Sequence, residues 1–135
     1  MSGTHVLVID DDPDVREALR LILEPHGYRM TLCATGPQGR EAAAKETPDV
    51  ILLDIMLATV SEGFHVAYEL KKNERLADVP IIMISSIGET MGMDYARELG
   101  SDYMPAEVFL SKPLDAARVL KEVEKAIGKA HSAQA

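Results

Sequence analysis

The sequence contains one cysteine, no tryptophan and few aromatic residues, which make up 4% of its 135 residues. A single cysteine excludes an internal disulfide framework, and the apolar neighbours of Cys33 indicate a small, buried strand residue. The scattered tyrosines do not form a stacking platform for single-stranded nucleic acid. We therefore expect a fold that is held by a hydrophobic core rather than by cross-links.

Positive charge and long hydrophobic runs are also scarce. There are 14 Lys and Arg residues against 22 Asp and Glu residues, for a formal net charge of -8. Phosphate backbones and anionic lipids are bound by an excess of Lys and Arg, so no direct nucleic-acid binding is expected. No apolar stretch approaches the roughly 20 residues that cross a bilayer, and the first residues carry no basic leader. The sequence thus predicts a soluble, cytoplasmic protein with no membrane partner.

Length and hydrophobic content indicate a single domain. At 135 residues, of which 47% are hydrophobic, the chain can bury one core and has little room for a second. We expect one domain over residues 1–135, with its folded core at about 4–129 and a frayed tail at 130–135.

Apolar runs indicate five strands. Three unbroken runs, at 6–9, 50–53 and 81–84, are typical of strands that are covered on both faces of a parallel sheet. Weaker runs at 28–33 and 108–110 have the β-branched or aromatic content of further strands.

Helical patterns separate these runs. The first helix should begin at Pro13 with Asp12 as its N-cap and end before Pro25 and Gly27. The remaining helices are predicted at 37–46, at 64–72, at 89–99 and after an Asp115 cap. Parallel neighbours need crossover helices, so the alternation predicts a doubly wound α/β fold. We expect a five-stranded parallel sheet of flavodoxin-like order 2-1-3-4-5, with five helices on its two faces.

Acidic residues follow the two strands that should flank the reversal of strand order, where such sheets bind ligands. Asp10, Asp11 and Asp12 close the first strand, and Asp54 closes the third. Carboxylates this close repel one another, and a hard dication bound by oxygen relieves the repulsion. Mg²⁺ suits a shallow rim because it keeps several waters and takes one or two carboxylates. Asp12 and Asp14 are better explained as capping residues of the first helix.

A hydroxyl and a positive charge follow the other two strands. Ser85 and Ser86 end the fourth strand, and Lys112 and Pro113 follow the fifth. Taken alone, Lys112 would be an ordinary surface lysine. Its place on the same rim as Asp54 instead points to a role beside the carboxylates.

Four short motifs at the strand ends resemble those of the response-regulator receiver family. They are Val8-Ile9-Asp10-Asp11, Leu53-Asp54-Ile55-Met56, Ile84-Ser85 and Ser111-Lys112-Pro113. The resemblance spans nearly the whole chain and implies a phosphoacceptor of a two-component or phosphorelay system, in a single-domain, chemotaxis-regulator-like form. It implies a signalling protein rather than an enzyme, one that at most catalyses its own phosphorylation and slow dephosphorylation.

The resemblance implies a phosphoacceptor and a metal site. Asp54 would take the phosphoryl group, and Asp11, Asp54 and the backbone carbonyl of Met56 would bind Mg²⁺, for which Mn²⁺ could substitute. Asp10 would help to hold the metal's water shell.

The resemblance also implies a cation and a switch. Lys112 would pair with the phosphoryl oxygens. The peptide bond between Lys112 and Pro113 would be cis. The hydroxyl of Ser85 would turn toward the phosphoryl group, and the ring of Phe109 would move inward after it.

The implied partners are proteins. A histidine sensor kinase or a phosphotransfer protein would donate the phosphoryl group, and an unidentified downstream protein would read the face from the fourth strand to the fifth helix. The phosphorylated chain could form a homodimer.

Three departures from the family pattern stand out. Ala58 replaces a usual proline and Gly63 comes one residue late. Residues Tyr103 to Val108 form an insertion. Met56 and Ile87 are apolar where some members carry groups that orient hydrolytic water, which predicts slow self-dephosphorylation.

Two other functions remain open from the sequence. Asp10 and Asp12 have the spacing of nucleophile and acid/base in phosphohydrolases of the haloacid dehalogenase type, although Asp14 does not fit that motif. A pseudo-receiver that binds partners without phosphorylation would not need the full set of Asp11, Asp54, Ser85 and Lys112. The histidines, at positions 5, 26, 65 and 131, lack metal-ligand spacing and are predicted to be solvated surface residues.

Overall fold

The structure, a computed structural model, describes residues 4–54, 62–85 and 108–134; within these, the side chains of 62–64, 85, 108–109, 111 and 129–134 are not described. The strands are β1 (His5–Ile9), β2 (Arg29–Cys33), β3 (Val50–Asp54), β4 (Ile81–Ser85) and β5 (Val108–Ser111). They form one sheet of order β2-β1-β3-β4-β5, and every neighbouring pair is parallel. The predicted parallel α/β architecture is therefore confirmed.

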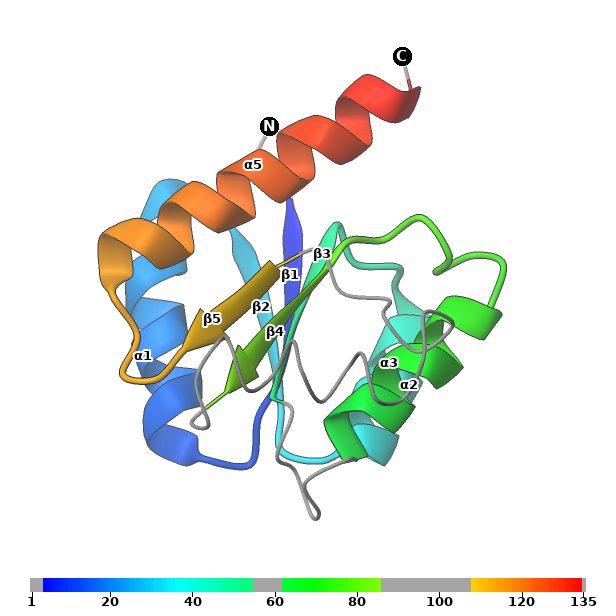
Figure 1. Ribbon diagram of the computed structural model, residues 1–135, viewed down its shortest axis with the longest axis horizontal. Helices are drawn as coiled ribbons and strands as arrows, with labels where there is room; N and C mark the ends of the chain where they lie inside the picture. The colour runs from blue at the N-terminus through cyan, green and yellow to red at the C-terminus, as the bar shows by residue number, and fades with distance from the viewer. Residues whose placement is uncertain (1–3, 55–61, 86–107, 135) are drawn as a thin grey trace.

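Helices cover both faces of this sheet (Figure 1). They are α1 (Pro13–Leu23), α2 (Gly36–Lys45), α3 (Glu62–Lys72) and α5 (Ala116–Gln134), with a short 3-10 helix, η1 (Glu24–His26), after α1. Figure 1 shows α1 and α5 on one side of the strands and α2 and α3 on the other. The helix predicted at 89–99 and residues 103–107 of the insertion lie outside the described part of the chain.

The strands divide the core into two layers because successive side chains point to opposite faces. Leu7 and Ile9 pack with residues of α2 and α3, whereas Val6 and Val8 pack with residues of α1 and α5. Every residue of β1 and β3 is buried, which agrees with the unbroken apolar runs at 6–9 and 50–53 within them.

The ends of α1 follow from local chemistry. Asp12 is its N-cap, and the carboxylate accepts a hydrogen bond of 2.9 Å from the backbone N–H of Asp14. After η1, Gly27 has a φ of 91°, a left-handed conformation that glycine adopts without steric cost. The predicted cap and the predicted stop are both confirmed.

The last helix, α5, extends into the segment where the sequence predicts a frayed tail. α5 begins directly after Asp115 and continues to Gln134, past the expected end of the folded core at residue 129. The final residues include no proline that would interrupt a helix. Among the described helices, none is both long and apolar enough to cross a bilayer.

His5 is buried, so the prediction of a solvated surface residue is wrong at this position. Only 3% of its surface is exposed, because β1 lies between β2 and β3. Its Nε2 lies 2.6 Å from the Thr31 hydroxyl, and its Nδ1 lies 3.9 Å from the Glu46 carboxylate without a hydrogen bond. Burial, the largest effect on this ring, lowers the pKa of His5 below its usual 6.5. Exposed His26 and His65 agree with the prediction.

Helix α2 approaches the sheet closely because its inner face is made of small residues. Gly36, Gly39 and Ala43 are buried there. A methyl group at Gly39 would overlap the side chain of Ile9, which is itself fully buried. The close approach of α2 to β1 therefore depends on the missing side chain at position 39.

We expect Gly39→Ala to lower the free energy of unfolding by up to about 2 kcal/mol, because overpacking against Ile9, which typically costs about 1–3 kcal/mol, outweighs the roughly 1 kcal/mol by which alanine favours a helix over glycine. Gly128→Ala on α5 is the matched control, since a Cβ there meets no atom within 4 Å. It should leave stability equal or slightly higher. Urea denaturation of both variants makes the comparison, and equal effects would contradict the close-packing account.

We also expect the unsubstituted chain to lose stability as pH falls below 6.5. The pKa of folded His5 is lowered, so the unfolded chain takes up a proton in a range where the folded chain does not. In His5→Gln this loss should be smaller, whereas His26→Gln, at an exposed position, should keep it. Urea unfolding at a series of pH values tests this, and an unchanged pH dependence in His5→Gln would refute it.

Candidate functional site

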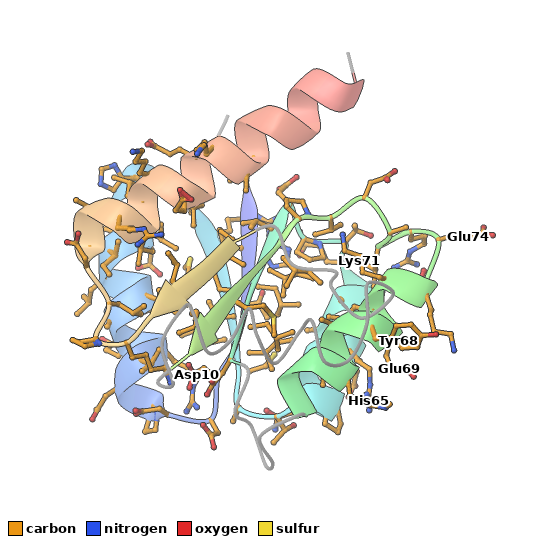
Figure 2. The ribbon with its side chains drawn as sticks, in the orientation of Figure 1. Asp10, His65, Tyr68, Glu69, Lys71 and Glu74 are labelled. Carbon is orange, nitrogen blue, oxygen red and sulfur yellow. The ribbon has the colours of Figure 1, made fainter. Side chains whose placement is uncertain are left out.

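The candidate site lies at the edge of the sheet where the parallel strands end. Asp10 follows β1, Asp54 is the last residue of β3, and Lys112 follows β5. β1 and β3 are neighbours, and the strand order reverses between them. Figure 2 labels Asp10 at this edge, away from the side chains labelled on α3. The sheet therefore brings together three residues that are far apart in sequence, as predicted.

Asp10 is fully buried, and most of its polar groups are held by hydrogen bonds. Its backbone N–H donates to the carbonyl of Cys33 at 3.0 Å, and its Oδ1 accepts from the N–H of Asp12 at 2.9 Å. Its other carboxylate oxygen, Oδ2, is buried and accepts no hydrogen bond from the described residues. The charge on this oxygen is opposed instead by the ammonium of Lys112, whose Nζ lies 3.3 Å away.

Asp10, Asp11 and Asp54 together fit a divalent cation. One carboxylate oxygen from each lies within 4.8 Å of the others; Asp10 and Asp54 are buried, and Asp11 is exposed. Carboxylate oxygens are the ligands that Mg²⁺ takes, and the exposed side leaves room for the waters that it keeps. The buried Oδ2 of Asp10, which accepts no hydrogen bond, agrees with such a site.

Lys112 supplies the opposing charge. Its Nζ lies 3.3 Å from Asp10 Oδ2, an ion pair without hydrogen-bond geometry, and donates a hydrogen bond of 3.4 Å to Asp54 Oδ2. Burial alone would lower the pKa of Lys112, but the two carboxylates outweigh it and raise the pKa above its usual value. The ammonium therefore stays charged at neutral pH. The peptide bond from Lys112 to Pro113 is cis, as the resemblance implied.

The remaining predicted site residues are located only in part. Ser85 is the last residue of β4, opposite Ser111, and Phe109 lies in β5 opposite Met83. Their side chains are not among those described, and Met56 lies outside the described residues altogether.

Sequence reasoning missed one residue that contacts this site. Nη1 of Arg16, the fourth residue of α1, donates a hydrogen bond of 2.9 Å to the backbone carbonyl of Asp10. A cation near a helix N-terminus opposes the helix dipole, since the unpaired N–H groups there favour negative charge. An arginine in the first turn of a predicted helix is therefore the feature of the sequence that could have indicated a tertiary partner for Arg16.

The sequence pattern that defines the response regulator receiver domain matches residues 6–124. The chain belongs to this family. It is 34% identical over 119 residues to "DNA-binding dual master transcriptional regulator RpaA" of a Synechocystis species, an alignment that covers 88% of the chain and 47% of the relative. The chain thus spans about half the length of the curated relatives that it matches.

Two solved structures agree with this membership. NtrX from Brucella abortus, in complex with ADP, superimposes with a TM-score of 0.83 at 26% identity, covering 98% of this chain and 29% of that one. The receiver domain of sensor histidine kinase PA1611 from Pseudomonas aeruginosa has a TM-score of 0.79 at 26% identity, covering 93% and 98%. That structure has a magnesium ion coordinated in its active site cleft.

We expect Lys112→Met to lower the free energy of unfolding in metal-free buffer at neutral pH by about 1–3 kcal/mol, because two buried carboxylates lose their opposing charge. Lys121→Met, the same substitution at an exposed position of α5, should change it little. In an Asp54→Asn background the cost of Lys112→Met should shrink, since one carboxylate is gone. Equal costs in the two backgrounds would contradict the pairing of Lys112 with Asp54.

Proposed function

We propose that this protein is a signalling phosphoacceptor in which Asp54 takes a phosphoryl group in the presence of Mg²⁺. The observation that supports this best is the ammonium of Lys112, 3.3 Å and 3.4 Å from carboxylate oxygens of Asp10 and Asp54, on a rim where three carboxylates converge. A fixed cation beside a buried carboxylate and a site for a dication are what phosphoryl transfer to an aspartate requires.

The proposed reaction uses few protein groups. A carboxylate oxygen of Asp54 attacks phosphorus and forms a C–O–P mixed anhydride, while the bond from phosphorus to the donor breaks and the leaving group keeps its electrons. Lys112 offers its positive charge to the transferred oxygens. Because the bond changes occur on the phosphoryl group, the protein contributes mainly position and electrostatics.

The dication would be held by Asp11, Asp54 and the backbone carbonyl of Met56, with Asp10 orienting bound water. Mg²⁺ would neutralise charge on the transferred oxygens, and Mn²⁺ could replace it. The magnesium ion in the similar receiver domain of PA1611 supports the assignment.

The output is proposed to be a change of shape. New contacts from the phosphoryl group to Ser85 and Lys112 would stabilise one of two states, and Phe109 would follow the Ser85 hydroxyl inward. The switched face would run from β4 to α5, where a downstream protein or a second copy of the chain would bind.

The proposed donor is a phosphohistidine on a sensor kinase or a phosphotransfer protein, which follows from family membership. DNA binding is named for the relative RpaA, which is about twice as long as the aligned region. Nothing in the charge of this chain, which is -8, favours nucleic acid as its own partner.

The hydrolase alternative gains no support. It requires Asp12 as a mobile acid/base, but the carboxylate of Asp12 is used as the N-cap of α1, at 2.9 Å from the N–H of Asp14. The pseudo-receiver is the alternative that the experiment below must distinguish.

Incubation with acetyl phosphate and Mg²⁺, followed by intact-mass spectrometry, tests the proposal. We expect one phosphoryl adduct on the unsubstituted chain, none on Asp54→Asn, and none with EDTA. Asp14→Asn, the same substitution at an exposed position of the neighbouring helix, should be modified normally.

No adduct on the unsubstituted chain, under conditions that modify another receiver domain, would support the pseudo-receiver. Steady phosphate release that depends on Asp10 but not on Asp54 would support the hydrolase. The same samples followed over time test slow self-dephosphorylation, which an adduct lifetime no longer than that of free acetyl phosphate would contradict.

A further inference from the structure

Three hydrogen bonds hold the chain at Asp10, and one of them comes from a charged side chain. The backbone N–H of Asp10 donates to Cys33, and its Oδ1 accepts from Asp12. Its carbonyl oxygen accepts a hydrogen bond of 2.9 Å from Nη1 of Arg16 in a partly buried setting. A bond from a guanidinium to a carbonyl is charge-assisted, and such bonds are stronger than those between neutral groups.

The carbonyl that Arg16 holds belongs to the peptide unit joining Asp10 to Asp11. The atoms of a peptide unit lie in one plane, so fixing the direction of its C=O also fixes the N and Cα of the next residue. Arg16 therefore sets the direction in which Asp11 leaves the end of β1. Because Asp10 and Asp11 supply two of the three converging carboxylates, the contact bears on the whole cluster.

We propose that Arg16 is a positioning residue for the dication site. It orients the Asp10–Asp11 peptide plane so that both carboxylates are placed for binding before the ion arrives. The inference rests on the proposed function, because it assumes that the cluster binds Mg²⁺. Groups that orient metal ligands without touching the metal typically change affinity by about 10- to 100-fold when they are removed.

Removing Arg16 should change Mg²⁺ affinity in opposite directions according to whether the residue acts through its charge or by orienting the peptide plane. A guanidinium that is bonded to the carbonyl of Asp10 repels a dication that binds at the Asp10 and Asp11 carboxylates, so if only its charge mattered, removing it would strengthen Mg²⁺ binding. If it acts by orienting the peptide plane, removing it weakens binding although the site becomes more negative. The sign of the change thus separates the two roles.

The experiment is a calorimetric titration with MgCl₂ of the unsubstituted chain and of four variants, Arg16→Met, Arg16→Lys, Arg20→Met and Arg20→Lys. Arg20 is the matched control, since it lies one turn further along α1 and pairs with Glu17 and Glu24 rather than with Asp10. We expect Arg16→Met to bind Mg²⁺ roughly tenfold more weakly. Arg16→Lys, which keeps the charge but loses the planar fork and is one bond shorter, should bind about threefold more weakly. Both Arg20 variants should bind within about twofold of the unsubstituted chain.

The proposal is overturned if Arg16→Met binds Mg²⁺ as tightly as the unsubstituted chain, or more tightly. It is also overturned if Arg16→Met and Arg20→Met lose the same amount of Mg²⁺ affinity. Thermal unfolding shows whether each variant is folded. Should Arg16→Met fail to fold, the comparison of Arg16→Lys with Arg20→Lys decides, and equal affinities overturn the proposal. An unsubstituted chain that binds no Mg²⁺ overturns the metal site itself, a result distinct from unchanged affinity in the variants.

Discussion

The arrangement of this protein's functional edge depends on the pairing of one ammonium with two buried carboxylates. Asp10 and Asp54 have almost no exposed surface, and isolated charges in that setting are strongly destabilising. Lys112 opposes them from the position directly after β5, a strand that is separated from β1 in the sheet by β3 and β4. The pairing is possible only because all of these strands run parallel and so end at one edge. The parallel arrangement of the strands is therefore what brings the ammonium to the two carboxylates and forms the site.

Packing beneath this edge keeps the charged groups in place. Ile9, the last residue of β1, is held against α2, whose small inner residues allow the helix to come close. Asp10 follows directly, so its position is set by a packed core residue on one side and by the Arg16 hydrogen bond on the other. Well-packed cores do not deform continuously, and a site built at the end of such a strand is correspondingly rigid.

The sequence predicted most of the described elements, because their causes are local. Apolar runs located the strands to within about a residue at most ends, and the Asp12 cap and the Gly27 stop follow from side-chain and backbone chemistry. His5, which was wrongly predicted to be exposed, and Arg16, whose contact with the site was not predicted, do not follow from local sequence. Each is explained by a contact outside its own helix or strand. His5 of β1 contacts Thr31 of β2, and Arg16 of α1 contacts the carbonyl of Asp10, which follows β1. The hydrophobic periodicity of a sequence does not reveal such contacts.

The charge of the cluster indicates why phosphorylation would change this protein. Three carboxylates against one ammonium leave two net negative charges at the rim, which one dication would neutralise. A phosphoryl group on Asp54 would replace a carboxylate with a group that carries up to about two negative charges, so the balance would be broken again beside Lys112. Hydrogen-bond donors that turn toward the phosphoryl group would stabilise this added charge. Lys112, which pairs with both carboxylates in the unphosphorylated chain, would turn to the transferred oxygens on Asp54. A hydroxyl such as that proposed for Ser85, the last residue of β4, would be a second donor, and its movement would carry the signal away from the rim.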